Sequence, residues 1–307
     1  MKIVVARPRG FCAGVDRAIR SVEQALERHG APVHVLNHIV HNAHVVEELR
    51  GKGAVFVRDL DEVPEGGLVL FSAHGVGPDR WAHAKRRGLN VIDATCPLVE
   101  KVHNEARRFS EKGRTVILVG EAGHDETVGT MGWAPGHILL VQTLEEAGRV
   151  AVPDPANTAY ITQTTLSVED CRAIVEVLKR RFPEIQAPPR EDICYATSNR
   201  QAAVVALSPE ADLVLVVGDA ESANSKRLRD IARGMGKPAH LIPDAGAIRP
   251  EWLDGVESLL LTSGASVPER LVAEVIEYAR ALGPCEVEER TLVEEDVEFR
   301  LPKELLK

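Results

Sequence analysis

The chain has 307 residues, of which 44% are hydrophobic and 27% charged, and its formal net charge is -9. This composition is typical of a water-soluble globular protein of about two domains, and the negative charge argues against a nucleic-acid-binding surface. No apolar run approaches the roughly 20 residues of a membrane span, and the opening MKIVVARPRG lacks the apolar core of a signal peptide. Five widely scattered cysteines are typical of a reducing compartment. We therefore expect a cytoplasmic enzyme or binding protein without nucleic-acid or membrane partners.

The first predicted elements are a short apolar strand over residues 3–6 and an amphipathic helix that begins near Val15, with Cys12 between them. This setting recurs twice, in VIDATCPLVEKVHNEARRF around Cys96 and in REDICYATSNRQAAVVALS around Cys194. In each copy the helix leads to an apolar strand with a polar end, VHVLNHIVHN, TVILVGEAGHDET or DLVLVVGDAESAN. The sequence therefore contains an internal repeat.

The spacing within the copies supports the repeat. The polar strand ends at His41, His124 and Ser222 follow their cysteines by 28 or 29 residues. A further strand in each copy also ends in polar or small groups, in LVLFSAHG, AYITQTTLS and SLLLTSGAS. Short apolar runs that alternate with helical patterns predict βαβ units and parallel sheets.

These patterns predict an α/β fold of three small, pseudo-symmetric domains. The first spans residues 14–96, the second 97–193, and the third 194–283 together with the N-terminal strand in residues 1–13. Residues 284–307 are acidic and carry no repeat, so we expect a C-terminal tail that lies across the domains.

The cysteines and polar loops all fall at the carboxyl ends of predicted strands. Ligands of open parallel sheets gather at these ends. Three domains arranged about a pseudo-threefold axis would therefore aim Cys12, Cys96 and Cys194 at one central site.

Three thiols from three domains allow three interpretations. A zinc site is disfavoured, because structural zinc sites are usually closed by four protein ligands, often in CxxC pairs, and no CxxC occurs. A [4Fe-4S] cluster can draw ligands from distant segments, and three thiolates would leave one iron open for chemistry. Inert buried thiols are the third interpretation. Cys171 and Cys285 lie outside the repeat and are expected to be ordinary thiols.

The polar loop ends also indicate what else the site binds. His and Ser side chains, together with the N–H groups of helix N-termini, are donors of the kind that hold phosphate. We therefore expect a small anionic ligand. The donors in question are His41, His74, His124, Ser222, Asn224 and Ser266.

The chain resembles the 4-hydroxy-3-methylbut-2-enyl diphosphate reductase family from about residue 3 to 280. The motifs that carry this resemblance, in order, are PRGFCAGVDRAI, IVHN, FSAHGV, DATCPLV, GHDE, TQTTLS, DICYAT and SGAS. The resemblance implies a three-domain trefoil and one [4Fe-4S] cluster per chain. It also implies a two-electron reductive dehydroxylation that ends the methylerythritol phosphate route by yielding isopentenyl and dimethylallyl diphosphates. The implied electron donor is a ferredoxin or flavodoxin.

The resemblance also assigns roles to residues. Cys12, Cys96 and Cys194 would bind the cluster and leave one iron without a protein ligand. Glu126 would deliver a proton, with Thr165 as a possible hydroxyl relay. If the GHDET loop is extended, Asp125 points away from Glu126 toward solvent. The diphosphate would lie among His41, His74, His124, Thr164, Thr165, Ser222, Asn224 and Ser266.

One stretch departs from the family pattern. Where the family usually has Lys-Asn-Ser-Ser-Asn-Ser, this chain has AESANS. Ala223 therefore replaces a hydroxyl donor, and Asp219 and Glu221 bring carboxylates nearby. A lost neutral hydrogen bond costs about 0.5–1.5 kcal/mol, so this departure concerns substrate affinity more than reaction type.

Two other functions fit the residues without the resemblance. A zinc-dependent phosphoester hydrolase could use His41, His74, His124 and Glu126. A binding module without turnover could use the same loops. Iron, sulfide and a brown colour would distinguish the reductase from either.

Overall fold

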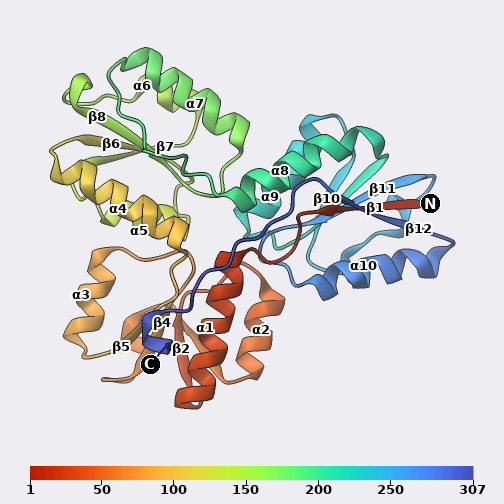
Figure 1. Ribbon diagram of the computed structural model, residues 1–307, viewed down its shortest axis with the longest axis horizontal. Coiled ribbons are helices and arrows are strands. Elements are labelled where there is room, and N and C mark those ends of the chain that lie inside the picture. Colours follow the sequence, from red (N-terminus) through yellow and green to blue (C-terminus); the bar gives the residue numbers. More distant parts are fainter. Residues whose placement is uncertain (307) are drawn as a thin grey trace. The chain divides into compact units, whose positions relative to one another are not determined.

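A computed structural model describes residues 1–306, in which strands and helices alternate to form three parallel sheets (Figure 1). The α/β prediction is thereby confirmed. The first sheet has the order β3-β2-β4-β5. Its strands are β2 (Val33–Leu36), β3 (Ala54–Val57), β4 (Leu68–Phe71) and β5 (Asn90–Asp93), and the accompanying helices are α1 (Ala13–His29), α2 (Ala43–Gly51) and α3 (Pro78–Arg86).

The second sheet repeats this arrangement with the order β7-β6-β8. The place next to β8, where the first sheet has β5, is taken by an isolated parallel bridge between Ala159 and Gln186. The strands are β6 (Thr115–Val119), β7 (Ile138–Val141) and β8 (Thr158–Thr162), and the helices are α4 (Pro97–Glu111), α5 (Asp125–Gly132), α6 (Leu144–Arg149) and α7 (Val168–Arg181).

The third sheet has the order β10-β9-β11-β1-β12, so the N-terminal strand joins strands from the last third of the chain, as predicted. Its strands are β1 (Lys2–Arg7), β9 (Leu213–Val217), β10 (Ala239–Ile242), β11 (Ser258–Ser263) and β12 (Glu286–Thr291). Its helices are α8 (Tyr195–Leu207), α9 (Ala223–Gly234) and α10 (Glu269–Leu282). Short 3-10 helices complete the described fold at Leu60–Glu62, Pro155–Asn157, Ser208–Glu210, Ala245–Ala247, Pro250–Trp252 and Lys303–Leu305.

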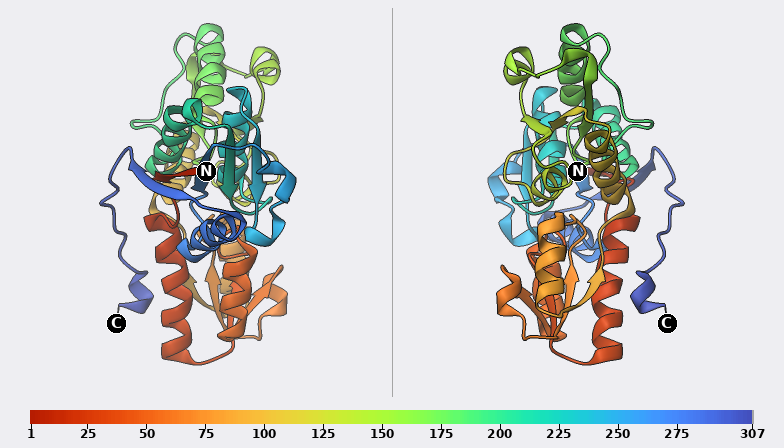
Figure 2. Two further views of the ribbon diagram at one scale, coloured as in Figure 1. Left: turned by 90° about the vertical axis from the view of Figure 1, so that its right-hand side faces the viewer. Right: turned by 90° about the vertical axis from the view of Figure 1, so that its left-hand side faces the viewer.

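The segment expected to be a tail contributes to the third sheet. β12 pairs in parallel with β1 along six residues at the sheet edge (Figure 2). Its sequence EVEERT is charged, and Glu288 and Glu289 form ion pairs with Lys2 and Arg7. An exposed edge strand needs no continuous apolar run, which is why hydrophobicity did not reveal it.

The chain divides into two compact units, which are described separately below. The first unit comprises Met1–Asp16, His41–Glu47 and Tyr195–Glu298, and it holds the third sheet. The second comprises Arg17–Val40, Glu48–Cys194 and the C-terminal residues from Phe299, and it holds the first and second sheets. The boundaries of the three repeats, 14–96, 97–193 and 194–283, stay a prediction.

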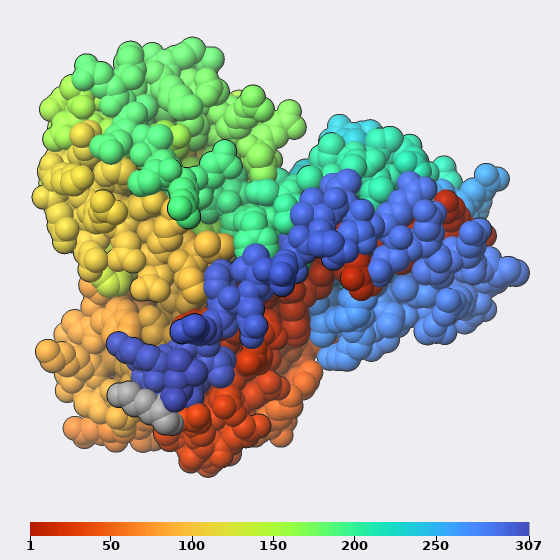
Figure 3. All heavy atoms as spheres, in the orientation of Figure 1, coloured from red at the N-terminus to blue at the C-terminus, as the bar shows by residue number. Residues whose placement is uncertain are grey.

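In the first unit, helices cover both faces of the sheet. Alternate strand residues such as Val5, Leu215 and Leu261 pack with α10, while Val4 and Val216 pack with α8 and α9. Figure 1 shows α10 on one side of the strands and α8 with α9 on the other. Because both faces are buried, the inner strands β9, β11 and β1 carry continuous apolar runs. Residues 292–298, which follow β12, lie on the surface of this unit (dark blue in Figure 3).

The second unit is built by the same rule. Ile117 and Val119 of β6 pack with α6 and α7, while Val116 and Leu118 pack with α4. In the first sheet, Val69 and Phe71 of β4 pack with Ala84 of α3 and with the loop before it. None of the helices within residues 1–306 is long and apolar enough to span a bilayer.

Close packing in the first unit fixes the loop that follows β11. The side chain of Ser225 on α9 is fully buried between Gly218 and Gly264, and it donates a hydrogen bond to Ser222 at 3.0 Å. A Cβ atom at Gly264 would overlap the Ser225 hydroxyl.

We expect Gly264→Ala to lower the free energy of unfolding by about 1–3 kcal/mol, because the new methyl group overpacks this contact. Gly148 in α6 has nothing within 4 Å of an added Cβ. The control Gly148→Ala should raise stability by about 0.4–1 kcal/mol. Chemical denaturation measures both, and equal shifts in the same direction would contradict the packing argument.

Candidate functional site

Each of the three repeated cysteines lies directly before a helix. Cys12 precedes α1, Cys96 is the residue that caps α4, and Cys194 precedes α8. All three cysteines are of intermediate exposure. The positive end of a helix dipole favours negative charge, so each position suits an anionic ligand group.

The backbone of each cysteine makes the same hydrogen bond. The N–H of Cys12 donates to Ala265 O at 3.2 Å, that of Cys96 to Ala73 O at 3.0 Å, and that of Cys194 to Thr164 O at 3.0 Å. The acceptors lie in the loops that follow β11, β4 and β8, the equivalent strands of the three sheets. The repeat predicted from spacing is therefore present as a repeated backbone contact.

Polar side chains of the second unit gather around α5. Glu126 is buried at 2% exposure, and its Oε1 accepts a 2.6 Å hydrogen bond from Thr164 N–H. Its Oε2 accepts a 2.9 Å bond from the Thr164 hydroxyl. Burial raises the pKa of Glu126 to about 7, although both bonds from Thr164 favour the charged form. A carboxyl with this pKa can hold or release a proton near neutral pH.

Two histidines lie at the start of α5, near this carboxyl group. His124 caps α5, and its Nδ1 accepts from Glu126 N–H at 3.2 Å. The rings of His74 and His124 meet edge to face with centroids 5.8 Å apart. The Asp125 carboxylate lies 3.9 Å from His74 Nδ1 and accepts from Asn37 Nδ2 at 3.3 Å.

Within the GHDET segment, residues 125–127 are helical and not extended. Asp125 and Glu126 are the first two residues of α5, so the expectation of opposite-facing side chains from an extended loop is wrong. Their difference in environment arises from the helix start, where Glu126 is buried and Asp125 is half-buried.

In the first unit, a second group of predicted residues surrounds the start of α9. Ser222 caps this helix, and its Oγ accepts from Ser225 N–H at 3.3 Å. Asn224 is 5% exposed, and within the described chain neither polar atom of its side-chain amide has a hydrogen-bond partner. Ser266 Oγ donates to His41 O at 2.9 Å. A buried, unpartnered amide is costly, so Asn224 has the character of a group that awaits a ligand.

Comparison with known proteins identifies the family. The sequence model of the LytB protein family matches residues 3–280. The chain belongs to the LytB family. It is 54% identical over 304 residues to 4-hydroxy-3-methylbut-2-enyl diphosphate reductase from Bordetella pertussis, with 99% of this chain and 94% of the relative covered. The Burkholderia pseudomallei enzyme of the same name is 52% identical over 305 residues, with 99% and 97% covered.

Solved structures of the same family agree. The E-1-hydroxy-2-methyl-but-2-enyl-4-diphosphate reductase from Plasmodium falciparum superposes with a TM-score of 0.93 at 36% identity, covering 99% of this chain and 96% of that one. A structure of (E)-4-hydroxy-3-methyl-but-2-enyl diphosphate reductase gives a TM-score of 0.64 at 32% identity and covers 92% and 100%. The prediction of a reductase of this family is confirmed, and the zinc hydrolase alternative receives no support.

The structure brings some predicted residues of this LytB chain together within each unit. In the second unit, the contacts above link His74, His124, Glu126 and Thr164. In the first unit, Ser266 contacts His41. The Thr165 hydroxyl, predicted as a proton relay, accepts from Gln163 Nε2 at 2.9 Å, whereas the hydroxyl in contact with Glu126 belongs to Thr164. The roles of these residues stay predictions.

Gln163 is a residue of this region that was not predicted from the sequence. This buried side chain accepts from Glu121 N–H at 2.8 Å and from the Thr127 hydroxyl at 3.1 Å, and it thereby ties the loop after β6 to the loop after β8. Its position, one residue past the end of an apolar strand and within the TQTTLS motif, was the available signal.

The residues that depart from the family pattern, Asp219 and Ala223 among them, have defined contacts in the structure. Asp219 Oδ2 accepts from Ala43 N–H at 3.1 Å, and Oδ1 accepts from Glu221 N–H at 2.8 Å. The Asp219 carboxylate therefore stabilises backbone donors of two neighbouring loops. Ala223 is buried at 2% exposure in the first turn of α9.

The raised pKa of Glu126 predicts a pH-dependent stability. Its folded-state pKa of about 7 exceeds the ordinary 4.5, so the folded protein binds this proton more tightly than the unfolded chain. Wild-type stability should therefore fall as pH rises from 4.5 to 7, while Glu126→Gln cannot titrate. The stability of Glu126→Gln relative to wild type should rise by about 2–4 kcal/mol across this window, as measured by denaturation at each pH. A difference that is constant with pH would contradict the buried carboxyl.

Proposed function

We propose that this chain is an iron-sulfur enzyme that reduces (E)-4-hydroxy-3-methylbut-2-enyl diphosphate to isopentenyl diphosphate and dimethylallyl diphosphate. The reaction breaks the allylic C–O bond, consumes two electrons and two protons, and releases water. Family membership supports the reaction and implies a metal-sulfur cofactor in general terms. The finer proposal, one [4Fe-4S] cluster with one iron lacking a protein ligand, depends on the cysteines.

The observation that carries the cluster proposal is the repeated setting of Cys12, Cys96 and Cys194. Each is a partly exposed cysteine at a helix start, with its N–H bonded to an equivalent loop. The other two cysteines differ. Cys171 is buried within α7, where burial raises the pKa of its thiol to about 12, and Cys285 Sγ donates to Gly283 O at 3.3 Å. The donor set thus fits a cluster held by three thiolates.

The cluster, when bound, would supply electrons and a Lewis acid for the allylic oxygen. A soluble electron donor such as a ferredoxin or flavodoxin would deliver the electrons. The polypeptide must then hold the diphosphate and provide the protons.

Glu126 is proposed as the proton donor. Hydroxide is a poor leaving group, so the allylic oxygen needs a proton to depart as water. Burial keeps a large fraction of Glu126 protonated near neutral pH. The Thr164 N–H and hydroxyl fix the orientation of its two oxygens. Thr165 lies next in the chain and could relay a proton through its hydroxyl.

The diphosphate is proposed to bind to the donors at the strand ends. With a net charge of -9, the chain as a whole repels anions, so directed donors must supply the attraction. The unpartnered Asn224 amide and the helix start capped by Ser222 supply such donors in the first unit. His41, His74, His124, Thr164, Thr165 and Ser266 complete the proposed set.

Substitution of the cysteines tests the cluster. After anaerobic purification, Cys12→Ser, Cys96→Ser and Cys194→Ser should each lose most iron and sulfide, because each removes one of only three protein ligands. Cys171→Ser and Cys285→Ser are matched controls and should retain both elements. Iron and sulfide analysis checks this, and full cluster content in Cys96→Ser would contradict the proposal.

Substitution of Glu126 tests its proposed role as the proton donor. Glu126→Gln keeps the shape and hydrogen-bonding capacity but has no acidic proton, so turnover should fall about 100-fold or more with the cluster intact. Wild-type turnover should also decline as pH rises through about 7, where Glu126 ionises. Asp125→Asn, at the neighbouring position, should retain nearly full turnover. Equal turnover rates for Glu126→Gln and wild type under saturating reductant would show that another group donates the proton to the allylic oxygen.

A further inference from the structure

Each proposed cluster cysteine is followed by a helix, and on that helix a cationic side chain lies five or six residues after the cysteine. Arg17 on α1 lies five residues after Cys12, and Lys101 on α4 lies five residues after Cys96. Arg200 on α8 lies six residues after Cys194. These three residues are called the clamp residues below, because of the contacts described next.

Arg17 binds the segment that leads to Cys96. Its Nη1 donates to Thr95 O at 2.9 Å, and its Nη2 donates to Asp93 O at 3.3 Å. Thr95 immediately precedes Cys96, and all these residues belong to the second unit. The guanidinium thus fixes the backbone just before the second cysteine.

Lys101 binds the segment that leads to Cys194. Its Nζ donates to Arg190 O at 2.7 Å, to Glu191 O at 3.0 Å and to Asp192 Oδ1 at 2.7 Å. The fully buried Asp192 side chain also accepts from Thr162 N–H at 2.8 Å, which joins the segment to the end of β8. One ammonium group therefore satisfies three acceptors directly before the third cysteine.

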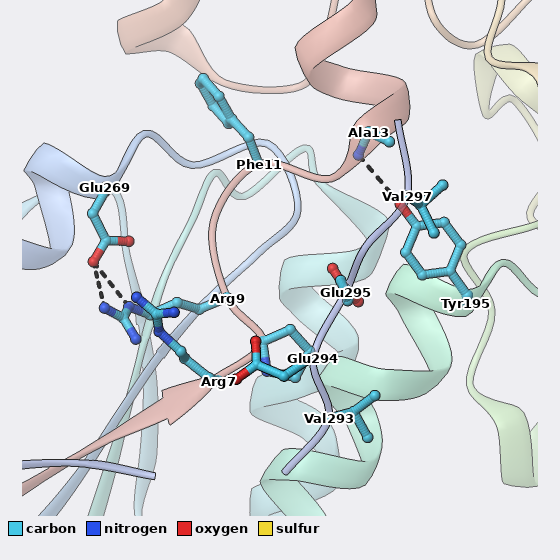
Figure 4. A pocket seen from close by; sticks show the side chains of 11 residues that line it. Arg7, Arg9, Phe11, Ala13, Tyr195, Glu269, Val293, Glu294, Glu295 and Val297 are labelled. Carbon is cyan, nitrogen blue, oxygen red and sulfur yellow. Dashed lines mark hydrogen bonds and ion pairs between the residues drawn. The ribbon is translucent and has the colours of Figure 1, made fainter. Parts of the chain in front are cut away.

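Arg200 binds the segment that leads to Cys12. Its side chain is fully buried, and its Nη2 donates to Gly10 O at 2.8 Å. Its Nη1 donates to Glu295 Oε1 at 3.0 Å, and Glu295 comes from the segment after β12 (Figure 4). Figure 4 also shows Tyr195, whose hydroxyl accepts from Ala13 N–H at 3.3 Å. These contacts all lie within the first unit.

The three contacts follow one rule in cyclic order along the chain. The helix after Cys12 holds the backbone before Cys96, the helix after Cys96 holds the backbone before Cys194, and the helix after Cys194 holds the backbone before Cys12. A single cation on a carbonyl oxygen is an ordinary structural contact. Three at matching positions, each directed at the next cysteine, indicate a shared role.

We propose that Arg17, Lys101 and Arg200 are positioning residues, each of which holds in place the cysteine next in this order, so that the three thiolates are pre-organised for cluster binding. This inference rests on the proposed cluster. Pre-organised ligands bind a metal centre with less ordering cost, so loss of a clamp residue should weaken cluster retention.

The first experiment measures cysteine reactivity in the full-length chain after the cluster has been removed. Alkylation by iodoacetamide at about pH 9.5, where a thiol of ordinary pKa is mainly ionised, reports access more than acidity. Mass spectrometry gives the rate at each cysteine. The rate should rise about tenfold at Cys96 in Arg17→Met, at Cys194 in Lys101→Met and at Cys12 in Arg200→Met, because hydrogen bonds from a charged donor are lost.

Controls distinguish local loosening from general unfolding. The buried Cys171 should react at the wild-type rate in every variant. Arg108→Met removes an exposed cation from α4 and should change no rate. Because Arg200→Met removes a fully buried charge, Arg200→Lys provides a milder variant with the same expected site of change. Equal rises at all cysteines, or a rise at the cysteine of the variant's own helix only, would overturn the proposal.

The second experiment measures iron release from the anaerobic holoenzyme to a chelator. Release should be about tenfold faster in the three methionine variants, and Arg17→Lys and Lys101→Arg should restore much of the wild-type rate. If wild-type protein takes up no iron and sulfide, the proposed function fails, while the alkylation pattern still tests positioning. If wild type holds the cluster and the clamp variants release iron at the rate of Arg108→Met, the positioning proposal fails.

Discussion

One backbone hydrogen bond, repeated three times, fixes the position of each cysteine that the proposed function uses. In each sheet the N–H of a cysteine donates to the loop after the neighbouring strand, and this bond fixes a thiol beside a polar strand end. Parallel pairing makes the contact possible, because the carboxyl ends of all strands meet at one edge. The helix that begins at each cysteine then carries the cation that holds the next cysteine segment. The sites on both units thus depend on strand order before any side chain is considered.

Much of this arrangement could be predicted from the sequence, because buried parallel strands are continuous apolar runs. Val214 to Val217 and Ile117 to Val119 are examples, and the residues just past such runs are the polar loop ends. Other features have no such pattern. β12 is an exposed edge strand stabilised by ion pairs, and the start of α5 at Asp125 lacks the apolar periodicity that marks a helix. The Glu126–Thr164 bonds and the clamp contacts join residues far apart in the chain, which spacing alone cannot pair.

The net charge of the chain is negative, whereas the helices that follow the three cysteines carry cationic side chains. The overall charge of -9 opposes anionic ligands, and exposed ion pairs such as Glu288 with Lys2 add nothing to it. Such pairs are screened by solvent and contribute little to stability. Arg200 and Lys101 are instead held by carbonyl oxygens and by buried or half-buried carboxylates. α1, α4 and α8 each carry a cation within two turns of a thiol, and at Lys101 and Arg200 the paired carboxylate offsets much of that charge.

The environment of Glu126 combines two opposing effects, and their balance explains how one carboxyl can suit proton delivery. Complete burial disfavours the charged form, whereas two hydrogen bonds from Thr164 favour it. Burial alone would produce a permanently neutral group that holds its proton too tightly, and the hydrogen bonds alone would produce a permanent carboxylate with no proton to give. Because both are present, the pKa lies near 7 and either form is accessible. Thr164 also accepts the N–H of Cys194 through its carbonyl oxygen. The same residue therefore ties the position of the acid to the position of a proposed cluster ligand.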